Sequence, residues 1–99
     1  MQDISSASVR RLQRVAATIP INLLLDREDS KTGHDAITVD FSLSGARVRT
    51  SLLLSPGETV QIVLWGNYGQ AIPSRVVWVH GASVFGSLAG LEFVNPLPA

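Results

Sequence analysis

Three arginines stand within five residues of one another near the N-terminus, at Arg10, Arg11 and Arg14. A guanidinium can hold a phosphate through two parallel hydrogen bonds and can also stack on a flat ring, and lysine does not combine these abilities. In an extended segment Arg10 and Arg14 could reach around one ligand, and in a helix their spacing would place them on one face. The cluster suits a ligand that has both phosphates and planar rings. The alternative is a solvated basic segment.

A second set of residues has the form Asp-x-Ser-x-x-Gly and comprises Asp40, Ser42 and Gly45. Apolar and polar residues alternate over 37–43, and successive residues of a strand point to opposite faces. The pattern therefore predicts that Asp40 and Ser42 lie side by side on an outward polar face, while Phe41 and Leu43 anchor the strand inside. Gly45 fits a tight turn or a close approach of a ligand to the backbone.

A carboxylate in this position can accept hydrogen bonds from the N1 and N2 donors of a guanine edge. The Watson–Crick edge of adenine offers no such pair of donors, so an acidic acceptor beside arginines indicates selectivity for guanine. The alternative for Asp40 to Gly45 is an ordinary polar strand end followed by a turn.

The elements that must position these residues are mainly strands. Alternation and turn residues predict strands over 18–25, 37–43, 46–51, 59–65, 70–80 and 89–94, with turns at 26–35, 55–58 and 66–69. Only residues 8–17 could form a helical turn or two, and Pro73 predicts an edge or a bulge in its strand. The expected fold is all-β, a small closed or nearly closed six-stranded antiparallel barrel.

Composition limits what such a chain can be. The 99 residues are 45% apolar and 16% charged, which is enough for one hydrophobic core and argues against disorder. We expect an N-terminal tail over 1–9 that is flexible, a barrel over 10–94 and a C-terminal tail over 95–99. The N-terminus lacks the order of a signal peptide and the apolar runs are too short to span a bilayer, so the expectation is a cytoplasmic protein without membrane insertion.

Several kinds of chemistry are disfavoured. The chain has no cysteine, and the distant His34 and His80 give no metal-ligand spacing, so no metal site is expected. Ser42 has no evident base, so no catalytic residue and no enzyme are predicted. Eight basic residues against eight acidic ones argue against DNA or RNA as partners.

An Arg-x-x-x-Arg motif at Arg10 and Arg14 is followed by the Asp-x-Ser-x-x-Gly motif that begins at Asp40. These two motifs in this order, on a β-rich chain of this length, resemble the PilZ family, whose members bind the bacterial second messenger cyclic di-GMP. The resemblance extends from Arg10 to about Phe93. It also includes residues 20–21, the turn at 56–58, the strand at 75–78 and the closing residues 89–93.

The resemblance implies a six-stranded barrel and a role for each motif residue. Arg10 and Arg14 would contact the phosphates and guanines, with Arg11 helping at the phosphates or by stacking. Asp40, Ser42 and Gly45 would line the facing wall. Ligand binding would order the N-terminal arginine segment and signal to a downstream effector protein, with no cofactor besides the ligand. Many PilZ domains carry a C-terminal helix, and with residues 96–99 (Pro-Leu-Pro-Ala) after the last strand no such helix is expected here.

Two other functions stay open at this point. One is a PilZ-fold module that binds a protein partner without nucleotide, through a surface around Trp65, Tyr68 and Phe85. The other is a small barrel that binds RNA or single-stranded DNA, in which Trp65 or Trp78 would stack on bases.

Overall fold

The computed structural model describes residues 15–27, 32–64, 70–83 and 86–98, and every regular element in these ranges is a β-strand. The strands are β1 (Val15–Ala16), β2 (Pro20–Leu25), β3 (His34–Phe41), β4 (Gly45–Thr50), β5 (Thr59–Leu64), β6 (Ala71–Ser83) and β7 (Gly86–Phe93).

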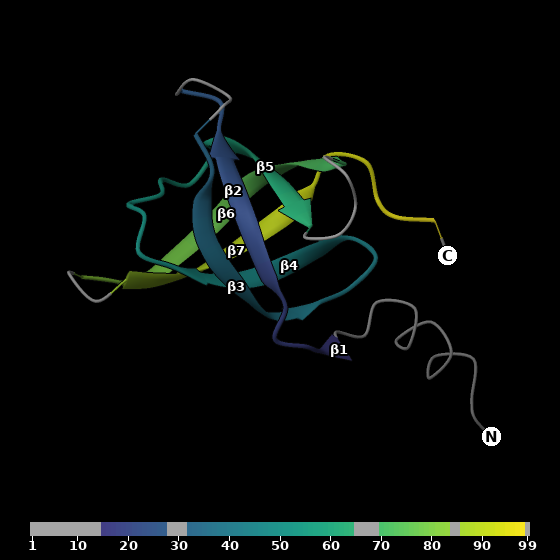
Figure 1. Cartoon of the computed structure of the whole chain (residues 1–99), viewed down its shortest axis with the longest axis horizontal. Coiled ribbons are helices and arrows are strands. Elements are labelled where there is room, and N and C mark those ends of the chain that lie inside the picture. Colours follow the sequence, from purple (N-terminus) through teal and green to yellow (C-terminus); the bar gives the residue numbers. More distant parts are fainter. Residues whose placement is uncertain (1–14, 28–31, 65–69, 84–85, 99) are drawn as a thin grey trace.

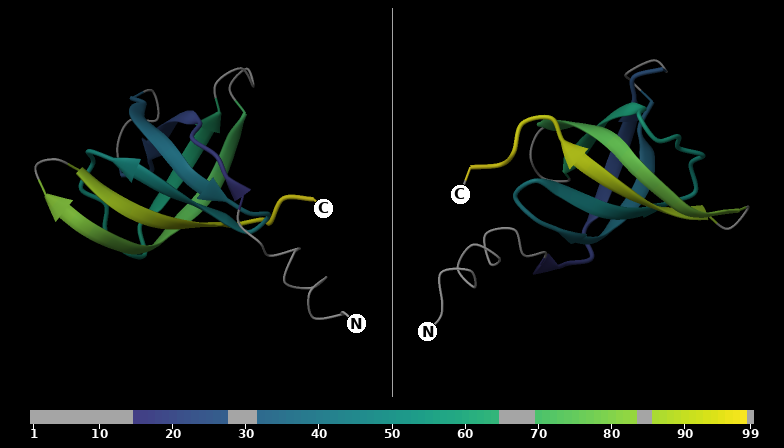
Figure 2. Two further views of the ribbon diagram at one scale, coloured as in Figure 1. Left: turned by 90° about the horizontal axis from the view of Figure 1, so that it is seen from below. Right: turned by 180° about the vertical axis from the view of Figure 1, so that it is seen from behind.

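Six of these strands close into an antiparallel barrel. The order is β3–β2–β5–β6–β7–β4, and β4 pairs again with β3 to complete the circle (Figure 1). The predicted all-β, six-stranded antiparallel barrel is therefore confirmed. β1 is an additional short strand that pairs with β3. From below and from behind, the paired ends of β6 and β7 project beyond the barrel wall (Figure 2).

The interior of the barrel is apolar because each strand contributes every second residue to it. In β2 the alternating leucine and isoleucine side chains are buried, and in β4 Ala46 and Val48 are buried between the outward Arg47 and Arg49. The most deeply buried apolar residues are Ile21, Leu23, Leu25, Val48, Val60 and Val76. This core fixes the wall on which the polar residues of the two motifs must stand.

Some element boundaries differ from those predicted. Residues 15–16 form a strand, so the helix predicted over 8–17 is wrong there, and the rest of it lies outside the described residues. His34 is not a solvated turn residue but the half-buried first residue of β3, opposite Leu23. His80 lies within β6 rather than at its end. The turn predicted at 66–69 lies outside the described residues.

The turn predicted at 55–58 is confirmed. Glu58 N donates to Ser55 O at 3.1 Å, and Gly57 has a φ of 90°, which only glycine adopts readily. Pro73 pairs with Gln61 at the point where the β6–β7 ladder ends, since the last pair of that ladder is Ser74 with Phe93. Its missing N–H therefore removes no bond from the body of the barrel.

Candidate functional site

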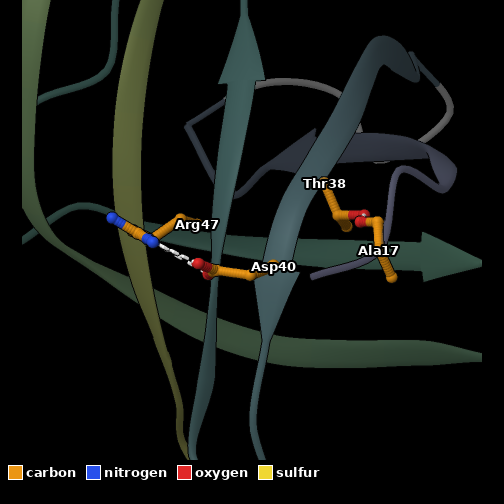
Figure 3. A network of polar contacts seen from close by, with 4 residues as sticks. All are labelled: Ala17, Thr38, Asp40 and Arg47. Carbon is orange, nitrogen blue, oxygen red and sulfur yellow. Dashed lines mark hydrogen bonds and ion pairs between the residues drawn. The ribbon is translucent and has the colours of Figure 1, made fainter. Parts of the chain in front are cut away.

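Asp40 and Arg47 form a bidentate ion pair across strands β3 and β4. The register places them directly opposite each other. Arg47 Nε lies 3.0 Å from Asp40 Oδ1 and 2.9 Å from Oδ2, and Nη2 also donates to Oδ2. Figure 3 shows the two side chains pointing toward each other from neighbouring strands. The hydrogen bond to Asp40, together with the negative charge of that residue, raises the pKa of the Arg47 guanidinium above its ordinary value.

The face prediction for this strand is wrong before Val39, where Thr38 is only 5% exposed and Ile37 is 40% exposed. Asp40 and Ser42 are also covered, at 5% and 6% exposed. The physical reason is a β-bulge at Val39: Thr38 pairs with the core residue Val48, but Asp40 pairs with Arg47 on the outer surface. The carboxylate of Asp40 is thus largely covered, and the half-exposed guanidinium of Arg47 connects it to solvent.

The Ser42–Gly45 segment is a closed turn. Ser42 N donates to Gly45 O at 2.8 Å, and Ser42 Oγ accepts from Ser44 N at 3.2 Å. A Cβ at Gly45 would overlap the carbonyl oxygen of Leu91 on β7, so this position needs glycine because two backbones approach closely. The neighbouring strand, rather than a ligand, makes the closest approach.

A flat surface continues from Arg47 across the outside of the barrel. Arg47 lies opposite Gly90 on β7, and Gly90 lies opposite Trp78 on β6. A Cβ at Gly90 would overlap the indole ring, so Trp78 lies directly over this glycine. The rings of Trp78 and His80 meet in a T-shaped arrangement, with centroids 5.4 Å apart and planes at 85°.

Two hollows flank Trp78. One, of about 180 Å³, includes Ser44, Gly45 and Gly90 in its lining, and the other, of about 340 Å³, is lined by Arg47, Trp78, His80 and Leu88. An aromatic ring between two hollows, next to a cation and a carboxylate, can hold planar rings and anionic groups together. We name Asp40, Arg47, Trp78 and Gly90 the outer-face site.

Replacement of Gly90 by alanine tests whether Trp78 is held in place in this way. We expect Gly90→Ala to displace the indole, because the added methyl group occupies the space of the ring. The measurement is tryptophan fluorescence, with a red-shifted emission as the expected result. Ala89→Gly on the same strand is the control for backbone effects, and an unchanged spectrum in Gly90→Ala would contradict the contact.

β1 brings the N-terminal segment to this site. Val15 lies opposite Phe41 and Ala16 lies opposite Asp40, on the edge of β3 that is not paired with β4. Arg14 is the residue immediately before Val15. Arg10, Arg11 and Arg14 themselves lie outside the described residues, so the structure brings together Asp40, Ser42 and Gly45 but does not test the arginines.

Sequence reasoning missed Arg47 and assigned Trp78 to a core or groove-lining role. Arg47 alternates with Ala46 and Val48 in its predicted strand, two residues after Gly45. This pattern indicated an outward side chain next to the Asp40 motif and could have identified Arg47 as a site residue. Trp65, Tyr68 and Phe85, which were considered as a partner surface, lie outside the described residues. In the described part of the chain no three His, Asp or Glu side chains gather as metal ligands, and no helix is long and apolar enough to cross a bilayer.

Comparison with known protein families identifies the family of this chain. The family model described as PilZ domain matches residues 8–99, which is nearly the whole chain and includes both motifs. The chain belongs to the PilZ domain family. PilZ domains are nucleotide-binding receptors rather than enzymes, and the family is known for binding cyclic di-GMP. A search of curated proteins finds no match.

Proposed function

We propose that this PilZ domain binds cyclic di-GMP at the outer-face site, with the N-terminal arginine segment closing over the ligand. The pairing of β1 with β3 carries the proposal, because Ala16 lies opposite Asp40 and the arginine motif ends two residues earlier, at Arg14. The two motifs, far apart in the sequence, are thus joined to adjacent strands.

The register makes the relation between the motifs more specific. Val15 pairs with Phe41, so extension of the ladder by one residue pairs position 14 with position 42. Residues directly opposite each other on neighbouring strands share a face. In this arrangement Arg14 would stand beside Ser42, on the face that carries Asp40 and Arg47.

The chemistry of the site fits a guanine dinucleotide. Asp40 has two carboxylate oxygens with about four acceptor positions, and Arg47 makes three contacts with them, so a guanine edge would replace part of these contacts rather than add to all of them. Arg47 and the arginine segment supply positive charge for the two phosphodiesters, and Trp78 offers a flat ring for stacking. The guanine rings and the phosphodiesters of cyclic di-GMP thus each have a counterpart in the chain.

In this proposal the output is mechanical rather than catalytic. A basic segment that docks on a preformed face when ligand binds changes what a partner protein can contact. The site residues Arg10, Arg11, Arg14, Asp40, Ser42 and Gly45 therefore act in binding alone, without a metal or a further cofactor. We place the protein in the cytoplasm, where it would pass the signal to an effector protein.

Isothermal titration calorimetry of the full chain with cyclic di-GMP tests the proposal. We expect saturable binding in the micromolar range or tighter, and much weaker binding of cyclic di-AMP, which keeps the phosphates but lacks the guanine donors. Equal binding of the two dinucleotides would contradict the role of Asp40. The absence of binding to either would overturn the function.

A further inference from the structure

The chain contains one extra residue between β1 and β2. Ala16 lies opposite Asp40 and Pro20 lies opposite Ile37. Three residues of the N-terminal chain, Ala17 to Ile19, therefore stand against only two residues of β3. β1 and β2 are thus one strand along the edge of β3, interrupted by a bulge.

The side chain of Thr38 holds this bulge at both ends. Ile19 N donates to Thr38 Oγ1 at 2.9 Å. The same hydroxyl donates to Ala17 O, and Figure 3 shows the side chain of Thr38 beside Ala17. The backbone adds two bonds, from Thr38 N to Ile19 O at 3.0 Å and from Ala17 N to Val39 O at 3.2 Å. Ile19 is thereby matched with Thr38 and Ala17 with Val39. The exposed Thr18 remains as the extra residue.

The bulge decides which residues of the N-terminal segment face Asp40. With it, Ala16 lies opposite Asp40. A strand that continued in this register toward the N-terminus would carry Arg14 and Arg10 on the face of Ala16, because every second residue of a strand shares a face. If the β2–β3 register continued without a bulge, Ala17 would lie opposite Asp40 and Val15 opposite position 42. A slip of one residue would then turn Arg14 to the other face.

We propose that Thr38 is a positioning residue for ligand binding, because its hydroxyl fixes the bulge that sets Ala16 opposite Asp40 and would thereby direct Arg14 and Arg10 to the face of Asp40. This inference rests on the proposed function and adds to it a residue outside both motifs. Thr38 is buried and would not touch the ligand, so it acts through the register of β1.

Replacement of the hydroxyl gives the first test. Thr38→Val keeps the shape of the side chain but removes both bonds, and we expect about tenfold weaker binding of cyclic di-GMP. Thr38→Ser keeps the hydroxyl and should bind nearly as the wild type does. Thr50→Val is the matched control, because Thr50 is equally buried and its hydroxyl accepts a local bond from Leu52 N, away from the β1–β3 ladder.

Deletion or insertion of one residue distinguishes an effect of Thr38 on the register of β1 from a general loss of folding. Deletion of Thr18 removes the extra residue. A regular ladder between the N-terminal chain and β3, without a bulge, would then place Arg14 opposite Ser42. We therefore expect Thr38→Val combined with this deletion to bind like the wild type. Insertion of one alanine between Ala16 and Ala17 leaves the bulge and Thr38 intact but shifts the arginines by one position. It should weaken binding about as much as Thr38→Val does.

Nuclear magnetic resonance of the ligand-free protein reads the register directly. Cross-strand contacts between Ala16 and Asp40 should be present in the wild type and lost in Thr38→Val. Full affinity in Thr38→Val or in the insertion variant, or failure of the Thr18 deletion to restore binding, would overturn the inference. If the wild type does not bind cyclic di-GMP, the proposed function fails, and the Ala16–Asp40 contacts still decide whether Thr38 sets the register.

Discussion

Asp40→Asn is expected to weaken the binding of cyclic di-GMP between about tenfold and a hundredfold, since hydrogen bonds to a charged group contribute about 1.5–3 kcal/mol. The amide presents a donor where guanine requires a second acceptor, and it removes the charge that holds Arg47 in its bidentate position. Calorimetry with cyclic di-GMP measures the change. The substitution keeps the size of the side chain, so circular dichroism should show an intact barrel.

Asp35→Asn provides the matched control for this change. Asp35 is an exposed carboxylate on the same strand, where it accepts from Asn22 Nδ2 at 3.1 Å, and it lies outside the outer-face site. We expect its affinity to equal that of the wild type. Equal affinities of Asp40→Asn and Asp35→Asn for cyclic di-GMP would show that the carboxylate of Asp40 does not contribute to ligand recognition.

Arg14→Ala should produce the second large loss, at least about tenfold, because it removes a charged donor from the position opposite Ser42. The loss should be greatest at low ionic strength, where charge contributes most to binding. Arg11 is an odd number of residues from Arg14 and would lie on the opposite face of a strand continued from β1, so Arg11→Ala should have a smaller effect. Arg75→Ala removes an equal charge from an exposed position on β6 and should leave binding unchanged. A larger loss in Arg11→Ala than in Arg14→Ala would contradict the register.

Local patterns in the sequence were sufficient to predict the barrel. Alternation marked the strands, and the Ser55–Glu58 segment formed the turn that its proline and glycine indicated. Closure followed because a small antiparallel sheet with one apolar face buries that face most completely as a barrel. The strand that begins at His34 was predicted three residues short, because its first residues are polar and looked like part of a turn.

The orientation of the Asp40 strand could not be predicted in the same way. Alternation assumes an uninterrupted strand and puts Thr38 on the same face as Asp40, but the bulge at Val39 turns Thr38 over the core while Asp40 lies on the outer surface. Nothing in the local sequence marks that bulge, since valine fits a regular strand equally well. The place of Trp78 beside Arg47 could not be predicted for a related reason. It depends on β7 lying between the strands of these two residues, and on a glycine at position 90.

The central claim is that cyclic di-GMP binds at the junction of β1, β3 and β4, beside Trp78. Titration of the isotopically labelled full chain with cyclic di-GMP, followed by nuclear magnetic resonance, tests it most directly. The account predicts that the largest shifts occur at Ala16, Ser42, Arg47, Gly90 and the indole N–H of Trp78, while the β2–β5 wall around Leu24 and Gln61 stays unchanged. Shifts confined to the β2–β5 wall, or no shifts at saturating ligand, would contradict it.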